Sequence, residues 1–274
     1  MAASNTFLRV LVSVITIPLI IFISYTGGIP FFIFVMFISL LSYYEFISFI
    51  KNIDISANFW VGFGGVLFSL LNNRYHYLDT YSFLIFFMLI LSASELFRKD
   101  GSPIANIGSV LFGVIYIGFF SSAIIGVREI FPQIGTLYER GGYIIISIFA
   151  TIWICDSAAF FGGTALGKHK LFPIVSPKKS WEGAIFGFIF AIGTMLLSKI
   201  IILDFFSWGT VIAIGIIIGI FGQVGDLFES LLKRSANVKD SSNLIPGHGG
   251  IFDRFDSLLF TAPIIFLYLT YFSK

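Results

Sequence analysis

The sequence predicts an all-α fold, a polytopic helical bundle embedded in a membrane, and two observations support this prediction. Hydrophobic residues make up 57% of the 274 residues, charged residues only 12%, and the mean hydropathy is +0.95. An ordinary soluble domain carries about 25% charged residues. The apolar residues also gather in long runs, and a helix needs about 20 of them to cross a bilayer. Helices are expected because they satisfy their own backbone polar groups in lipid.

The apolar runs define about nine transmembrane helices. In order, they are Leu8–Tyr25, Ile29–Ile50, Phe59–Leu71, Tyr81–Phe97, Ile107–Val127, Gly142–Gly162, Gly183–Leu203, Trp208–Ser230 and Ser257–Phe272. The first has a single basic residue, Arg9, at its N-terminal end, and no small-x-small cleavage site follows it, so we expect a retained span and not a signal peptide. The third is short and contains glycines, so it is expected to thin the bilayer or to enter it only partway.

The distribution of Lys and Arg predicts a cytoplasmic N-terminus. With nine spans, twelve of the 17 basic residues fall on the side of the N-terminus, and five fall on the other side. The twelve are Arg9, Lys51, Arg98, Lys99, Lys168, Lys170, Lys178, Lys179, Lys233, Arg234, Lys239 and Arg254. The five are Arg74, Arg128, Arg140, Lys199 and Lys274. Cytoplasmic loops carry the excess of Lys and Arg, so the larger set is placed in the cytoplasm. The short chain without a soluble extension leads us to expect a multi-pass protein of a bacterial plasma (inner) membrane.

No linker or internal repeat interrupts the chain, so residues 1–274 are predicted to form a single membrane domain. Residues 1–140 have the generic character of apolar spans. Residues 141–274 hold every dense motif, in or beside two polar loops, 163–182 and 230–256. Both loops fall on the predicted cytoplasmic side, where we therefore expect the active site. Charged residues are costly next to lipid, so a dense cluster at the membrane edge indicates function.

Composition argues against several classes of function. The net charge of +2 is too small to indicate a nucleic-acid partner. The one cysteine, Cys155, excludes an intrachain disulfide and a Cys-rich metal site. The chain has no G-x-x-x-x-G-K-[ST] motif, so P-loop chemistry is not indicated.

Asp156 and Asp226 are acids inside apolar segments, where a charged side chain costs roughly 2.5–3.5 kcal/mol at mid-helix. Asp226 lies near the cytoplasmic end of the eighth segment, where it either serves a site or pairs with Lys233 or Arg234 to hold helices together. At helical spacing, one stripe of this segment holds Gly215, Gly219, Gly222, Asp226, Ser230 and Lys233. Asp156 has no basic neighbour in the sequence, so we expect its partner to be another helix, through a Ser or Thr hydrogen bond, or a cation.

Three acids of the 230–256 loop, Asp240, Asp253 and Asp256, can join Asp226 in supplying oxygen ligands to a metal ion. Mg²⁺ typically takes one or two carboxylates, several waters and substrate phosphate oxygens. We predict Asp226 and Asp253 as the Mg²⁺ ligands, and Asp256 as a helix cap or a partner for Arg254. Acids in a first helical turn also complement the helix dipole, which is the structural alternative.

Two motifs offer phosphate contacts. The run S-P-K-K-S-W-E-G, beginning at Ser176, places Lys178 and Lys179 beside the N-terminus of the seventh segment, which Ser180 can cap. The run P-G-H-G-G places His248 in a tight turn whose backbone N–H groups can bind an anion. The alternatives are a lipid-headgroup patch for the lysines and a plain turn for His248.

Acids for a metal, basic groups for phosphates and no activated Ser, Cys or His couple indicate phosphoryl or nucleotidyl transfer. The run S-L-L-K-R-S-A-N-V-K-D-S-S-N-L-I-P-G-H-G-G-I-F-D-R-F-D, from Ser230 to Asp256, resembles the signature of the phosphatidate cytidylyltransferases, or CDP-diacylglycerol synthases. The runs D-S-A-A-F-F-G-G from Asp156, S-P-K-K-S-W-E-G and Q-V-G-D from Gln223 resemble the same family in the same order. Upstream of residue 141 the chain matches only as generic apolar spans.

The resemblance implies that CTP and phosphatidate react to give CDP-diacylglycerol and pyrophosphate. It also implies Mg²⁺ dependence and a homodimer, and it leaves room for a second, monovalent cation such as K⁺. The residues expected to act in catalysis are Asp156, Asp226, Lys239, Asp240, His248 and Asp253. The residues expected to bind substrate are Ser176, Lys178, Lys179, Ser180, Ser230, Lys233, Arg234, Gly249, Gly250 and Arg254.

Two other functions fit parts of the pattern. A CTP-dependent kinase of a membrane alcohol would use the same metal and phosphate contacts, but it would release CDP instead of pyrophosphate. A cation-coupled transporter of a phosphorylated solute would also place acids in broken helices. The sequence shows no inverted repeat, however, and its polar residues crowd one side of the membrane instead of the midplane.

Overall fold

The computed structural model describes residues 2–242, 244 and 249–273, and most of them are helical. In chain order, the elements are α1 (Ala2–Thr26), α2 (Gly28–Ile50), η1 (Lys51–Ile53), α3 (Phe59–Tyr75), α4 (Thr80–Leu96), α5 (Pro103–Gly113), η2 (Val114–Phe119), α6 (Phe120–Arg128), α7 (Gly135–Leu166), β1 (Lys170–Phe172), β2 (Ser176–Ser180), α8 (Trp181–Ile201), α9 (Trp208–Ile217), η3 (Ile218–Gly222), α10 (Gln223–Ser235) and α11 (Phe252–Tyr271). The elements from α5 to α6 form one continuous helix, and so do those from α9 to α10.

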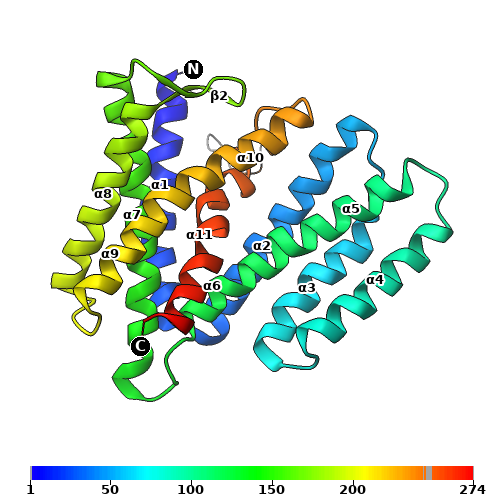
Figure 1. Cartoon of the computed structure of the whole chain (residues 1–274), viewed down its shortest axis with the longest axis horizontal. Coiled ribbons are helices and arrows are strands. Elements are labelled where there is room, and N and C mark those ends of the chain that lie inside the picture. The colour runs from blue at the N-terminus through cyan, green and yellow to red at the C-terminus, as the bar shows by residue number, and fades with distance from the viewer. Residues whose placement is uncertain (1, 243, 245–248, 274) are drawn as a thin grey trace.

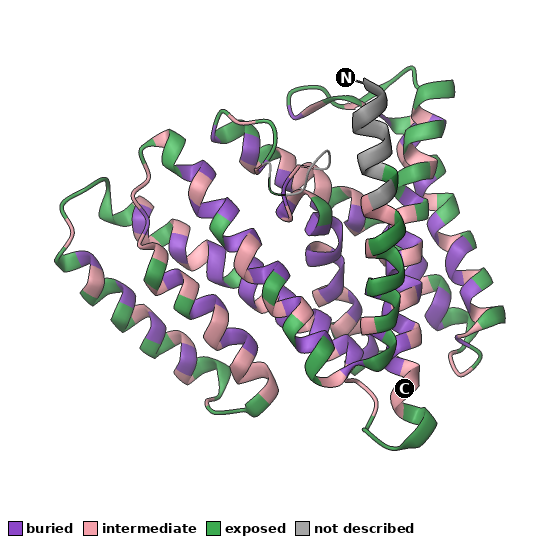
Figure 2. Ribbon diagram, turned by 180° about the vertical axis from the view of Figure 1, so that it is seen from behind, coloured by how far each residue is buried: buried purple, intermediate pink, exposed green. Residues whose placement is uncertain are grey.

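A nearly all-α membrane protein is confirmed, because each predicted apolar segment falls on a helix. Among the described residues, five helices are long and apolar enough to cross a membrane. They are Gly28–Ile53, Pro103–Arg128, Gly135–Leu166, Trp181–Ile201 and Trp208–Ser235. Two shorter apolar helices cover Val12–Thr26 and Thr80–Leu96. Many large hydrophobic side chains, such as Trp60 and Ile189, are exposed, and Figure 2 shows exposed residues along the outward faces of the helices. Lipid would solvate such faces.

The helices assemble around one hydrophobic cluster of buried side chains. In Figure 1, α7, α8 and α9 lie towards one side of the molecule and α3, α4 and α5 towards the other, with α6 and α11 between them. Helix α7 packs against α8 and α1, and α11 packs against α6, α10 and η3. The N-terminus, the β-hairpin and the end of α10 lie at one end of the bundle, and the C-terminus lies at the other (Figure 1).

A short β-hairpin in the 163–182 loop departs from the all-α prediction. Strands β1 and β2 pair antiparallel, with Lys170 opposite Ser180 and Phe172 opposite Ser176. Strands of three and five residues are too short to show a regular alternation of apolar and polar residues in the sequence. The hairpin packs against α7 and α8, so it holds the predicted phosphate-binding lysines against the ends of two long helices.

The predicted stripe from Gly215 to Lys233 does not face a single neighbour, and a π-helical turn explains why. The turn η3 lies between α9 and α10, and its i→i+5 bonding shifts the register of the helix. Gly215, before the turn, and Gly219, within it, approach α8. After it, Gly225 approaches Asp256 and Phe260 of α11. The π-helical turn adds one residue to the helix, and the acidic first part of α10 consequently faces α11.

Helix α3 offers a test of the close packing in the N-terminal half. A Cβ added at Gly62 would overlap the Tyr43 hydroxyl of α2 and lie 3.0 Å from Val110 of α5, whereas a Cβ at Gly64 would meet nothing within 4 Å. We expect Gly62→Ala to lower the free energy of unfolding by about 1–3 kcal/mol, because overpacking strains its neighbours. Gly64→Ala is the matched control and should leave stability unchanged or slightly raised. Thermal unfolding in detergent measures both, and equal melting temperatures would contradict the tight contact.

Candidate active site

A cavity of about 610 Å³ lies where α7, the β-hairpin, α8, α10 and α11 meet. Charged residues of both signs line it. The acids are Asp156, Asp226, Asp240, Asp253 and Asp256, and the bases are Lys178, Lys179, Lys233 and Arg254. Apolar side chains complete the wall, including Trp153, Phe160 and Leu171. The cavity can therefore hold anionic groups beside an apolar chain.

An ion pair between two elements lies in the wall of the cavity. Asp226 of α10 and Lys179 of β2 approach to 2.5 Å, and their side chains are 35% and 29% exposed. Asp156 of α7 lies within electrostatic range of both charges. The Asp156 side chain is accessible to solvent through the cavity that it lines, although protein atoms surround the cavity on most sides. The predicted alternative, a pair between Asp226 and Lys233 or Arg234, is wrong, because the partner of Asp226 is Lys179.

Asp256 adds a third carboxylate to this group. Only 7% of its surface is exposed, and it lies near Asp156 and Asp226. It does not cap α11, because the helix begins at Phe252 and the Asp256 carboxylate accepts a 2.6 Å hydrogen bond from the N–H of Ser257. The described residues contain no ion pair between it and Arg254. Asp156, Asp226 and Asp256 thus lie close together with few positive charges between them. A bound cation would offset their excess negative charge.

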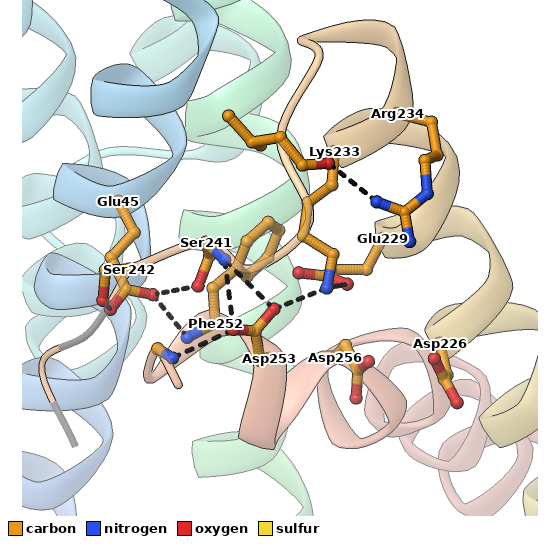
Figure 3. A network of polar contacts seen from close by, with 12 residues as sticks. Glu45, Asp226, Glu229, Lys233, Arg234, Ser241, Ser242, Phe252, Asp253 and Asp256 are labelled. Atoms are coloured by element: carbon orange, nitrogen blue, oxygen red, sulfur yellow. Dashed lines mark hydrogen bonds and ion pairs between the residues drawn. The ribbon is translucent and has the colours of Figure 1, made fainter. Parts of the chain in front are cut away.

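A second polar network surrounds Lys233 of α10 (Figure 3). Its ammonium lies 2.6 Å from Glu229 and 2.5 Å from Asp253, and all three side chains are less than one-tenth exposed. Asp253 also accepts hydrogen bonds from the N–H groups of Ser241, at 3.1 Å, and Gly250, at 2.9 Å. A buried charge is tolerated only when it is paired. These contacts therefore fix the orientation of Asp253 at the start of α11.

The β-hairpin is tied to the first turn of α8. Ser180 accepts a hydrogen bond from the Gly183 N–H, so its predicted role as the cap of this helix is confirmed. Glu182 accepts from the N–H of His169 and lies 2.6 Å from its ring nitrogen Nδ1. The hairpin consequently holds Lys179 beside the helix N-terminus, where free N–H groups favour anions.

The structure brings most of the predicted site residues to the cavity. Those in its wall are Asp156, Lys178, Lys179, Ser180, Lys233, Asp226, Asp240, Asp253 and Arg254. Among the described residues, those outside its wall are Ser176, Ser230, Arg234, Lys239, Gly249 and Gly250. The guanidinium of Arg234 donates to the Val238 carbonyl, and the Gly250 N–H, predicted to be free for an anion, is taken by Asp253. His248 lies outside the described residues.

Three residues of the networks were not predicted. Glu229 lies on α10 four residues before Lys233, at the spacing of a helical ion pair, and this spacing could have revealed it. Glu45 is an acid inside an apolar segment, and such an acid is itself a sign of function. Ser241 contacts both Asp253 and Glu45, and it lies in the signature run from Ser230 to Asp256, which could have revealed it.

The donor chemistry of the cavity suits Mg²⁺. Its acids offer the oxygen ligands that a hard divalent cation prefers. Its bases can hold substrate phosphates, whose oxygens would complete the coordination of the cation. Within the part of the chain that the structure describes, no three His, Cys, Asp or Glu side chains form a ready-made metal site. Mg²⁺ needs only one or two carboxylates when substrate phosphates and waters fill the remaining positions.

The sequence pattern of the cytidylyltransferase family matches residues 7–272. The chain belongs to this family. The predicted resemblance is therefore confirmed, and it extends through the N-terminal spans that the motifs alone did not cover. The protein is thus a nucleotidyltransferase, an enzyme that transfers a cytidylyl group.

Bacterial relatives named phosphatidate cytidylyltransferase are similar to this cytidylyltransferase. The protein of Bacillus subtilis (strain 168) is 36% identical over 189 residues, which cover 69% of this chain and 68% of the relative. That of Staphylococcus saprophyticus is 34% identical over 182 residues, 66% of each chain. That of Staphylococcus aureus (strain COL) is 41% identical over 128 residues, 46% of this chain and 49% of the relative. The matched part thus spans about two thirds of the first two relatives and about half of the third.

Lys179 gives a test of phosphate binding by this cytidylyltransferase. We expect Lys179→Ala to raise the KM for CTP or for phosphatidate by at least about tenfold, because hydrogen bonds to charged groups contribute about 1.5–3 kcal/mol. Lys170→Ala is the matched control, since Lys170 is an exposed lysine of β1 outside the cavity wall. Steady-state kinetics in detergent micelles measures both constants. An unchanged KM for both substrates would leave Lys179 as a partner of Asp226 only.

Proposed function

We propose that this cytidylyltransferase makes CDP-diacylglycerol and pyrophosphate from CTP and phosphatidate in phospholipid biosynthesis, at a site facing the cytoplasm. The observation that supports it most is the make-up of the cavity, in which clustered acids and bases lie next to apolar side chains. Phosphatidate combines an anionic headgroup with apolar chains in the bilayer. CTP is a soluble polyanion, and a cavity at the membrane edge is where the two can meet.

The proposed reaction is an in-line displacement. A phosphate oxygen of phosphatidate forms a bond to the α-phosphorus of CTP, and the bond from that phosphorus to the bridging oxygen breaks to release pyrophosphate. The attacking phosphate is already ionised, so no general base is required. Lys178, Lys179, Lys233 and Arg254 line the cavity and can offset the charge of two phosphorylated substrates.

Asp226 and Asp253 are the proposed Mg²⁺ ligands, with Asp156 and Asp256 as neighbouring acids. A bound Mg²⁺ would offset negative charge on the phosphates and help to orient them. Within the protein, Lys233 and two backbone N–H groups hold Asp253 in place. Lys179 pairs with Asp226 and lines the same cavity, so it can bind a phosphate once substrate enters.

Three finer features of the proposal come from the family resemblance and from the charge distribution. A second, monovalent cation such as K⁺ would bind near Asp156, and replacing K⁺ by a large organic cation should then lower the rate. The enzyme would be a homodimer, which light scattering of the purified protein tests. The nine helices would all cross the plasma membrane. A cysteine placed at Gln133 should then react with an impermeant maleimide in intact cells, and one placed at Lys99 should not.

Labelled CTP tests the proposed reaction. The purified protein is incubated in micelles with phosphatidate, Mg²⁺ and CTP radiolabelled at either the α- or the γ-phosphate. We expect the α-label in a new lipid and the γ-label in pyrophosphate. A γ-labelled lipid, formed when a membrane alcohol replaces phosphatidate, would show the kinase instead. No labelled lipid from either substrate would favour a carrier.

A further inference from the structure

Glu45 is a buried acid in the last two turns of the apolar helix α2 (Gly28–Ile50), far in sequence from the loop between α10 and α11. Its side chain is fully buried, and both carboxylate oxygens accept hydrogen bonds. The Ser241 hydroxyl donates to one oxygen at 2.8 Å, and the Ser242 hydroxyl donates to the other at 2.5 Å. The N–H groups of Ile251 and Phe252 donate at 2.9 and 2.8 Å. Figure 3 shows Glu45 facing Ser241 and Phe252.

These four hydrogen bonds offset the free-energy cost of burying the Glu45 carboxylate. A buried carboxylate is tolerated when hydrogen bonds replace its water, and its two oxygens accept about four such bonds. The contacts also complete α11. Its N-cap residue, Ile251, makes no capping hydrogen bond with its own side chain. Glu45 accepts from the first N–H groups of that helix instead, where a negative charge is favourable.

We propose that Glu45 is a positioning residue for the reaction. It holds together two segments of the loop between α10 and α11, which we call the neck, and thereby sets the orientation of Asp253. The neck is defined here as Ser241 and Ser242 on one side and residues 250–252 on the other. Both sides of the neck bond to Glu45. Both also bond to Asp253, through the N–H groups of Ser241 and Gly250. Two carboxylates from separate helices therefore hold the same short segments.

The backbone at Gly250 supports this arrangement independently. A Cβ at this position would overlap the Ser241 hydroxyl oxygen and lie 2.5 Å from a carboxylate oxygen of Glu45. The two sides of the neck thus approach so closely that only a glycine fits between the serine and Glu45. Because Asp253 lies three residues further on, a neck that loosens would release the backbone N–H groups that orient its carboxylate.

The test compares wild type, Glu45→Gln and Ser39→Ala. Ser39 is a matched control, since it is buried on the same helix and its hydroxyl donates to the Val35 carbonyl of that helix. In Glu45→Gln we expect amide hydrogen exchange at Ile251 and Phe252 to accelerate at least about tenfold. We also expect the Mg²⁺ concentration for half-maximal activity to rise about tenfold, as for other residues that orient a metal ligand. Ser39→Ala should change neither.

The Mg²⁺ readout separates positioning from a general loss of folded protein, because a smaller active fraction lowers the rate without moving the half-maximal concentration. This readout alone rests on the proposed function. Hydrogen exchange does not, so it tests the neck even if the reaction proves to be different. If Glu45→Gln fails to fold, the double variant Ser241→Ala, Ser242→Ala carries the same two predictions. Unchanged exchange and an unchanged Mg²⁺ requirement in a folded variant would overturn the proposal.

Discussion

We expect Asp226→Asn to lower turnover by on the order of 100- to 1000-fold, the usual cost of removing one group that stabilises charge in a transition state. Asp226 lies in the cavity wall, opposite Lys179 and within electrostatic range of Asp156 and Asp256. The amide keeps the size of the side chain and removes its charge, so the cavity loses a carboxylate and leaves Lys179 without its partner.

Stability should change little in this variant. The ion pair of Asp226 is about one-third exposed, and exposed pairs contribute only about 0–1 kcal/mol. The measurements are the initial rate in micelles and the melting temperature of the purified protein. Asp204→Asn is the control, because Asp204 is an exposed acid in the loop between α8 and α9. A rate within about twofold of wild type would remove Asp226 from the active site.

We expect Asp253→Asn to lower both turnover and stability. Asp253 is almost fully buried, pairs with Lys233 and accepts two backbone hydrogen bonds. An amide keeps one acceptor oxygen and presents its NH₂ group to donors, so at least one N–H or ammonium loses its partner. Leaving a buried polar group unpaired costs about 1–3 kcal/mol, and more for a charged group. Lys233 still contacts Glu229, which limits the loss.

The contrast between the two variants separates their roles. Asp226→Asn should lose activity at almost unchanged melting temperature, whereas Asp253→Asn should lose activity and melt several degrees lower. Thermal unfolding and initial rates measured on the same preparations decide this. A melting temperature for Asp253→Asn equal to that of the Asp204→Asn control would show that the network around Lys233 does not hold the start of α11.

The sequence predicted much of the fold because long apolar runs and their polar boundaries are local signals. The helices match these runs, and the cap at Ser180 follows from the residues beside it. It also predicted that Asp156, Asp226, Asp253, Lys179 and Lys233 share one region, since their motifs lie at neighbouring helix ends. The resemblance to a family then indicated which chemistry this region performs.

Other features depend on contacts that no local pattern contains. Glu45 meets Ser241 across 196 residues of sequence, and only the three-dimensional packing brings them together. The π-helical turn η3 redirects α10 without a change in its apolar character, so the predicted glycine stripe was wrong. The pairing of Asp226 with Lys179 instead of Lys233 depends on the hairpin, whose strands are too short to predict.

The most direct measurement is the binding of Mn²⁺, as a spectroscopic stand-in for Mg²⁺, in the presence of CTP. Electron paramagnetic resonance of free Mn²⁺ gives the affinity of the wild type and of the Asp226→Asn, Asp253→Asn and Asp204→Asn variants. We expect each of the first two substitutions to weaken binding at least about tenfold and the third to leave it unchanged. Wild-type affinity in both Asp226→Asn and Asp253→Asn would show that these carboxylates hold no metal.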